Sequence, residues 1–157
     1  MISILKLAAI TLLSVAPGLD LAGATADVAV VVRSDIPVDD LSFAEVRKLF
    51  MGDRQYWSSN LRVTLLIRAP AARERDVVLK TIYGMSEPQF RQYWISKIFR
   101  LEASNGPKIV YSTEMATELV AAIPGAVTFM DSAIVPKSLK IVKIDGRLPG
   151  ERGYRLH

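Results

Sequence analysis

The sequence predicts an α/β domain in which a mostly parallel sheet is flanked by helices. Short β-branched or alternating apolar runs recur along the chain, and segments with helix start and stop signals separate them. No internal repeat or linker divides the chain. Its 157 residues, half of them hydrophobic and 23% charged, have the composition of a single globular domain.

The apolar N-terminus predicts a targeting signal rather than a part of the fold. An apolar run at residues 7–16 is too short to span a bilayer as a stable helix. The Ala-Thr-Ala trio at 24–26 then fits the small-x-small pattern of a cleavage site. We therefore predict a signal peptide over residues 1–26 and a periplasmic or secreted domain over residues 27–157. The alternative is an uncleaved N-terminal anchor.

The composition narrows the chemistry that is open to the chain. It has no cysteine and only one histidine, His157, at the end of the sequence. Disulfides, cysteine nucleophiles and multi-histidine metal sites are therefore not expected, and a Ser-His-Asp triad is disfavoured. The net charge of +4 favours an anionic partner, but the basic residues form no stripe, so no nucleic-acid partner is predicted. After signal removal, no remaining segment is apolar enough to predict a transmembrane helix.

The first strand and the first helix carry clear local signals. Residues 27–33 form a β-branched run that is typical of a buried strand. Ser42 and Glu45 have the spacing of a capping box, and Gly52 suits the end of the helix that follows. The two aspartates at 39–40 lie just before this helix, where negative charge favours its dipole. They are interpreted in that way rather than as a catalytic pair.

The later elements continue the alternation of strands and helices. We expect a strand over 61–67, a helix over about 72–83, a helix after a second capping box at 86–89, a strand over 108–111, a helix over 113–123, strands over 126–130 and 139–144, and a basic tail from 146. Tyr56 and Trp57 lie in a polar loop before the second strand. There they are candidate stacking platforms for a base or a sugar.

The turn after the second strand is the strongest candidate for a binding site. Ligands gather at the carboxyl ends of strands in α/β sheets, and a helix start offers free backbone N–H groups to an anion. Arg68 and Arg73 could add bidentate contacts, while Ala71 and Ala72 would contribute their backbone. The alternative is a solvated basic turn in which Glu74 pairs locally. No catalytic residue, metal ligand or cofactor motif is predicted, so the protein is not expected to be an enzyme.

Several segments together carry a resemblance to a known family. They are LSFAEVRKLFMG at 41–52, the following Trp57, the strand that ends at Arg68, MSEPQFRQYW at 85–94 and PGAVTF at 124–129. These segments resemble those of phosphate ABC transporter substrate-binding proteins, which are type II periplasmic binding proteins, and of short, single-lobe members of that superfamily. The resemblance extends over nearly all of residues 27–144. It implies one lobe of that binding-protein fold.

The resemblance also implies a function, which is non-enzymatic binding of phosphate or a similar small oxyanion with a link to phosphate transport. In phosphate-binding relatives, an arginine after the strand is followed by a Ser-Gly-Thr turn that holds the anion. Arg68 matches that arginine, but Ala71 and Ala72 stand about where hydroxyls are expected. The chain also has material for about one lobe, whereas the relatives close two, so weak binding is expected. The alternative is an envelope protein-interaction module that has lost ligand binding.

Overall fold

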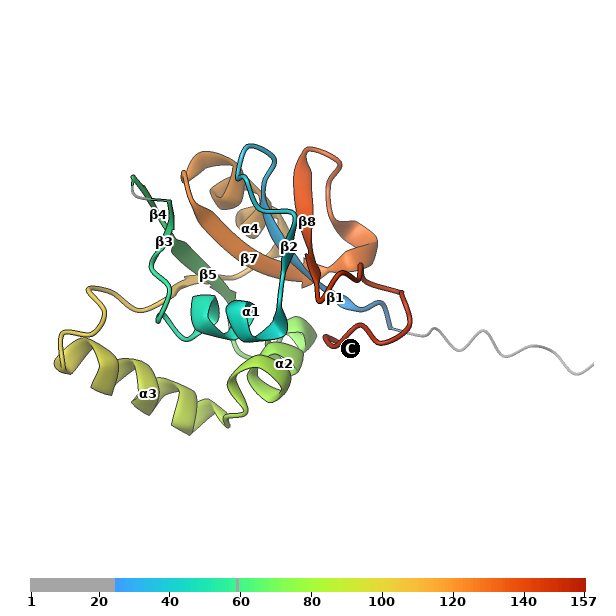
Figure 1. Ribbon diagram of the computed structural model, residues 1–157. Helices are drawn as coiled ribbons and strands as arrows, with labels where there is room; N and C mark the ends of the chain where they lie inside the picture. Colours follow the sequence, from blue (N-terminus) through green and yellow to red (C-terminus); the bar gives the residue numbers. More distant parts are fainter. Residues whose placement is uncertain (1–24, 59) are drawn as a thin grey trace, which may run out of the picture.

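A six-stranded sheet forms the centre of the protein, which the computed structural model describes over residues 25–58 and 60–157 (Figure 1). Residues 1–24 of the predicted signal peptide lie outside the described residues. Within the two described ranges, no helix has the length and apolar character needed to cross a membrane. In spatial order the strands are β2 (Asp40–Leu41), β8 (Leu139–Ile144), β1 (Val28–Arg33), β7 (Ala126–Asp131), β5 (Thr64–Arg68) and β6 (Lys108–Val110).

Five of these six strands run in the same direction. β2 pairs with β8 in parallel, and β5 pairs in parallel with both β7 and β6. β1 alone is antiparallel to both of its neighbours, β7 and β8. The predicted mostly parallel sheet is confirmed, with one reversed strand near its centre. Because β5 and β6 are parallel, their carboxyl ends meet at one edge of the sheet.

Helices cover both faces of the sheet (Figure 1). α1 (Phe43–Phe50), α2 (Arg73–Val78) and α3 (Glu87–Phe99) pack over one face, and α4 (Thr113–Ala122) packs over the other. Side chains of β1 alternate between the two cores, so that Val30 belongs to the first and Val31 to the second. In the first core, the rings of Phe50 and Phe129 lie 6.0 Å apart.

The predicted helix signals are present in the structure. Ser42 Oγ accepts the Glu45 N–H at 3.2 Å, and the Glu45 carboxylate accepts the Ser42 N–H at 2.7 Å. Ser86 begins α3 with an equivalent capping box. α2 continues into a π-helical turn, Leu79–Tyr83, which ends at Gly84 in the left-handed conformation. The local signals therefore located these helix boundaries correctly.

The expected second strand is divided in two. β4 (Leu61–Arg62) pairs with β3 (Tyr56–Ser58) in a separate ribbon, and β5 starts only at Thr64. Trp57 is 8% exposed, and its Nε1–H donates to the Gly125 carbonyl at 2.9 Å. The prediction of an open stacking platform at Trp57 is therefore wrong, because this side chain anchors the ribbon to the turn before β7.

The basic tail packs against the start of β1. Tyr154 and Leu156 are buried, and the Tyr154 hydroxyl donates to the Val28 carbonyl at 2.6 Å. The Val28 N–H donates in turn to the Leu156 carbonyl at 2.8 Å. Burial raises the pKa of Tyr154 well above its ordinary value. The tail therefore covers the start of β1 and extends the first core (Figure 1).

Candidate functional site

The turn at the carboxyl end of β5 places Arg68 beside the start of α4. The Arg68 Nη1 donates to Thr113 Oγ1 at 2.9 Å, and Thr113 is the first residue of that helix. The Arg68 Nε is buried and has no hydrogen-bond partner. A buried donor without an acceptor is costly, since it has lost its water without gaining a bond. The Arg68 guanidinium therefore has an unused donor at the edge where ligands bind in α/β sheets.

Ala71 and Ala72 shape the same turn through their backbone. Ala71 has a φ of 73°, in the left-handed region that residues with a side chain rarely adopt, at a cost of about 1 kcal/mol. Ala72 is the N-cap of α2 and gives no side-chain cap, so the N–H groups of the next two residues have no acceptor within the helix. A left-handed residue in such a turn directs successive N–H groups into one concavity, which suits an anion.

Arg73 is engaged with the neighbouring strand. Its Nη2 donates to the Ala26 carbonyl at 2.7 Å and lies 3.3 Å from the Asp131 carboxylate at the end of β7. The alternative of a solvated basic turn expected Glu74 to pair locally with an arginine. The acid beside Arg73 is instead Asp131. The structure thus brings Arg68, Ala71 and Ala72 into one turn and leaves Arg73 paired with an acid beside it.

Arg75, which the sequence did not single out, supports the turn from within. It is 3% exposed, and its Nε and Nη2 donate to the Glu87 carboxylate at 2.6 and 2.8 Å. Its Nη1 donates to the Arg68 carbonyl at 2.7 Å, and its guanidinium lies 4.9 Å from the Phe90 ring centroid. The hydrogen bonds from Arg75 hold the pKa of Glu87 below its ordinary value. Arg75 therefore links the end of β5 to the start of α3.

The three arginines around the turn differ in their ion pairs. Of the three arginines there, Arg73 pairs with Asp131 and Arg75 pairs with Glu87. Arg68 forms no ion pair with any described residue. Among residues 25–58 and 60–157, no three histidine, cysteine or carboxylate side chains gather where they could hold a metal ion. The turn therefore offers donors and one uncompensated positive charge.

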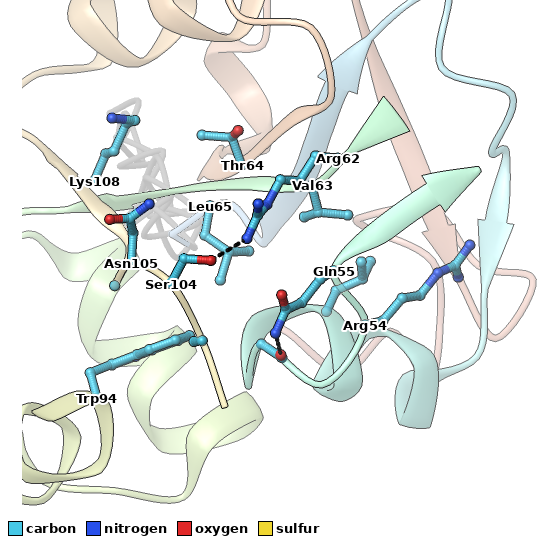
Figure 2. Close-up of a pocket in the computed structure, with 14 residues that line it drawn as sticks. Arg54, Gln55, Arg62, Val63, Thr64, Leu65, Trp94, Ser104, Asn105 and Lys108 are labelled. Atoms are coloured by element: carbon cyan, nitrogen blue, oxygen red, sulfur yellow. Dashed lines mark hydrogen bonds between the residues drawn. The ribbon is translucent and has the colours of Figure 1, made fainter. Parts of the chain in front are cut away.

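A second feature, a cavity of about 220 Å³, lies at the opposite end of β5 and β6 (Figure 2). Thr64 and Lys108, the first residues of these two strands, line it, whereas Arg68 ends β5 at the far edge. The other lining residues come from α1 and the loop after it, β4 and the residue that follows it, β5, α3 and the loop after α3. No local pattern in the sequence could have revealed a site assembled from so many separate segments.

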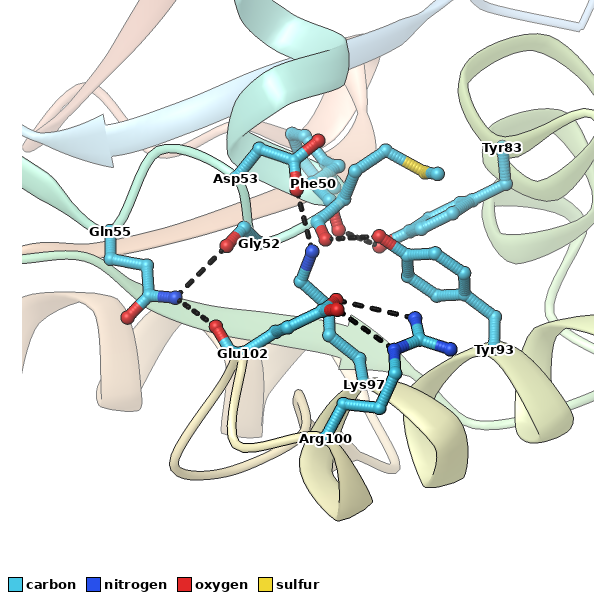
Figure 3. Close-up of polar contacts among 10 residues, drawn as sticks. Phe50, Gly52, Asp53, Gln55, Tyr83, Tyr93, Lys97, Arg100 and Glu102 are labelled. Carbon is cyan, nitrogen blue, oxygen red and sulfur yellow. Dashed lines mark hydrogen bonds and ion pairs between the residues drawn. The ribbon is translucent and has the colours of Figure 1, made fainter.

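Polar contacts fix the wall of this cavity near α3 (Figure 3). The Gln55 side-chain N–H groups donate to the carbonyls of Gly52 at 3.1 Å and Glu102 at 2.8 Å, which ties the loop after α1 to the loop after α3. Lys97 forms an ion pair with Asp53 at 2.5 Å. Burial lowers the pKa of Lys97, but its hydrogen bonds to Asp53 and to a tyrosine outweigh burial and raise it. These contacts hold the two loops together.

Two tyrosine hydroxyls cap the end of α1 beside this wall (Figure 3). The Tyr83 hydroxyl donates to the Phe50 carbonyl at 2.5 Å, and the Tyr93 hydroxyl donates to the Met51 carbonyl at 2.6 Å. Burial raises the pKa of Tyr83 well above its ordinary value, so this hydroxyl stays protonated and remains a donor. The end of α1 is thereby fixed against α3 and the π-helical turn.

Comparisons with known proteins show what the fold is similar to. No protein-family model matches the chain. Among solved structures, it is similar to a phosphate ABC transporter substrate-binding protein from Clostridium perfringens with bound phosphate, at a TM-score of 0.64 and 18% identity over 80% of this chain and 47% of that one. An ABC-type phosphate transport receptor from Vibrio cholerae matches with a TM-score of 0.64 and 19% identity over 80% of this chain and 49% of that one.

PstS from Borrelia burgdorferi is a third solved structure to which this protein is similar in fold. It matches with a TM-score of 0.61 and 12% identity, over 80% of this chain and 50% of that one. The chain therefore spans about half the length of the structures that it resembles. The structural matches establish a shared fold, and at identities this low they establish the fold alone. The resemblance seen in the sequence is therefore confirmed for the fold. Fold alone does not assign a ligand.

Proposed function

We propose that the protein is an exported, non-enzymatic binding protein that holds phosphate or a similar small oxyanion at the Arg68 turn. One observation carries the proposal: Arg68 has a buried, unused Nε–H and no carboxylate partner among the described residues, beside a turn with free backbone N–H groups. The fold shared with phosphate-transport proteins supports the same class of ligand. A periplasmic location and a link to phosphate transport belong to the proposal as well.

Binding at this turn is weak in our proposal. Ala71 and Ala72 supply no hydroxyl, and the Arg73 guanidinium is already shared with Asp131. The described residues form one lobe and span about half the length of the matched structures, and the weak binding proposed is that of this lobe by itself. One guanidinium and a few N–H groups are consistent with a Kd of roughly 1 mM, or about −4 kcal/mol.

Calorimetric titration of the purified protein with phosphate and with sulfate tests this function. Low ionic strength is required, because salt screens the attraction between Arg68 and the anion. We expect one weak site, and we expect Arg68→Gln to raise the Kd about tenfold or more through loss of a charged hydrogen-bond donor. The matched control is Arg152→Gln, which changes an exposed arginine of the tail. Absence of both heat and thermal stabilisation at millimolar phosphate would contradict the proposal.

A second candidate function is that of an envelope protein-interaction module. The observation that favours it is the set of exposed apolar side chains in the last turns of α3 and just after it, where Ile95, Phe99 and Leu101 are 61%, 87% and 91% exposed. Large side chains grouped on one exposed surface are typical of interaction sites. Pull-down from a periplasmic extract with the wild-type protein and with the Phe99→Ser, Leu101→Ser double variant tests this candidate. A partner retained only by the wild type supports it, and identical profiles contradict it.

A further inference from the structure

The cavity at the start of β5 and β6 contains positive charge that its own lining does not neutralise. Arg62 lies in one wall and Arg54 lies at the margin, whereas Lys108 lines the rim with its side chain directed to the other face of β5 (Figure 2). None of the three forms an ion pair with a described residue, and no carboxylate side chain lines the cavity. The flanking acids, Asp53 and Glu102, are already paired with cations of α3 and its C-cap. An anion would therefore meet attraction here without a competing carboxylate.

Part of the cavity lining is apolar. Trp94 from α3, Leu49 from α1, and Val63 and Leu65 contribute to it. Trp94 is 6% exposed, and its ring lies so close to Gly52 that a Cβ there would come within 2.8 Å of it. The ring is therefore held in place, and it offers a fixed surface to the apolar part of a ligand.

The cationic wall is also held in position. The Arg62 Nη2 donates to Ser104 Oγ at 2.6 Å, and the guanidinium carbon lies 5.9 Å from the Tyr56 ring centroid. Gln55 ties the two flanking loops together through its two carbonyl contacts. A site whose donors are already ordered loses less conformational entropy when it binds a ligand. Arg54 is different, since its guanidinium lies over the Trp57 ring at 5.5 Å and is directed to the margin.

We propose that this cavity binds a small organic carboxylate with an apolar body. The carboxylate lies beside the Arg62 guanidinium, and the body lies against Trp94 and Leu65. A cavity of roughly 150 Å³ can hold benzene, so about 220 Å³ accommodates a ring that bears a carboxylate. Inorganic phosphate would leave the apolar wall uncovered. The site lies at the other end of β5 from Arg68 and does not depend on the function proposed for that turn.

Backbone-amide NMR of the purified protein, titrated with phenylacetate at low ionic strength, tests the proposal. We expect saturable shifts in segments 63–65 and 103–106 and at the Trp94 indole N–H. Acetate carries the same charge without the body, and benzylamine carries a similar body with the opposite charge. Neither should reproduce these shifts at equal concentration. Arg62→Gln should raise the Kd at least about fivefold, because it removes a charged donor.

The control variant is Lys108→Gln, which removes an exposed lysine on the other face of β5 and should leave the Kd unchanged. The proposal is overturned if acetate gives equal shifts, if the shifts scatter over the surface, or if Arg62→Gln keeps the wild-type affinity. Since the Arg62 side chain is exposed, Arg62→Gln should fold normally. Phosphate at the Arg68 turn would shift residues 71–73 instead, so failure there and failure here are distinguishable.

Discussion

Replacement of Arg75 by methionine tests whether the ion pair beneath the Arg68 turn holds the end of β5 to α3. Methionine keeps most of the side-chain volume and removes all of the hydrogen-bond donors. Two bonds to Glu87 and one to the Arg68 carbonyl are lost together, as is the contact with the Phe90 ring. The turn should lose its support while the apolar packing changes little.

The expected cost of Arg75→Met follows from the environment of each partner. Breaking a buried ion pair typically costs about 3–5 kcal/mol, because the remaining charge has no partner. The Glu87 side chain is 30% exposed, so water can recover part of its solvation, and the lower end of that range applies. We therefore expect a loss of about 3 kcal/mol in the free energy of unfolding. This is a large share of the roughly 5–15 kcal/mol that stabilises a typical domain.

Urea unfolding followed by circular dichroism measures this loss. With an m-value of about 2 kcal/mol/M, the midpoint should fall by about 1.5 M for Arg75→Met. Arg152→Met, which replaces an exposed arginine of the tail, should change the free energy by no more than about 0.5 kcal/mol. A loss below about 1 kcal/mol for Arg75→Met, or an equal loss for Arg152→Met, would refute the reasoning.

Three further predictions concern acid stability, a close backbone approach and a helix cap. Arg75 lowers the pKa of Glu87 in the folded chain, so the free energy of unfolding should fall as the pH drops below about 4.5, the ordinary pKa of a glutamate. Urea titrations at several pH values measure this dependence, and Arg75→Met should weaken it. Gly125→Ala places a Cβ 2.0 Å from the Arg62 carbonyl oxygen, so thermal unfolding should show a loss of about 3 kcal/mol or more in the free energy of unfolding. Gly84 has open space around it, so Gly84→Ala should lose only about 1 kcal/mol, the cost of its left-handed backbone. Ser42→Ala removes the acceptor at the start of α1 and should cost about 1 kcal/mol in urea.

Features with a local cause could be predicted from the sequence. The capping boxes at Ser42 and Ser86 each lie within four consecutive residues, and both begin helices in the structure. Gly52 and Gly84 follow helices in the left-handed conformation that favours glycine. The Arg68 turn was located for a similar reason, since a strand end followed by a helix start is a local pattern.

Features that depend on distant partners could not be predicted. Trp57 looked exposed because its acceptor, the Gly125 carbonyl, is 68 residues away in the chain. Arg73 looked free because Asp131 is 58 residues away. The reversed direction of β1 and the burial of Tyr154 likewise arise from contacts across the sheet and with the tail. The cavity near Lys108 combines short segments from several elements, so no single segment indicates it.

The central claim is that the Arg68 turn is the anion site, and backbone-amide NMR with inorganic phosphate tests it most directly. The account predicts saturable shifts at Ala71, Ala72 and Arg73 and at Thr113, which contacts Arg68. It also predicts that Arg68→Gln raises the phosphate concentration at which these shifts are half complete by about tenfold or more. Unshifted resonances at these positions at millimolar phosphate, or an unchanged titration in Arg68→Gln, would contradict the account.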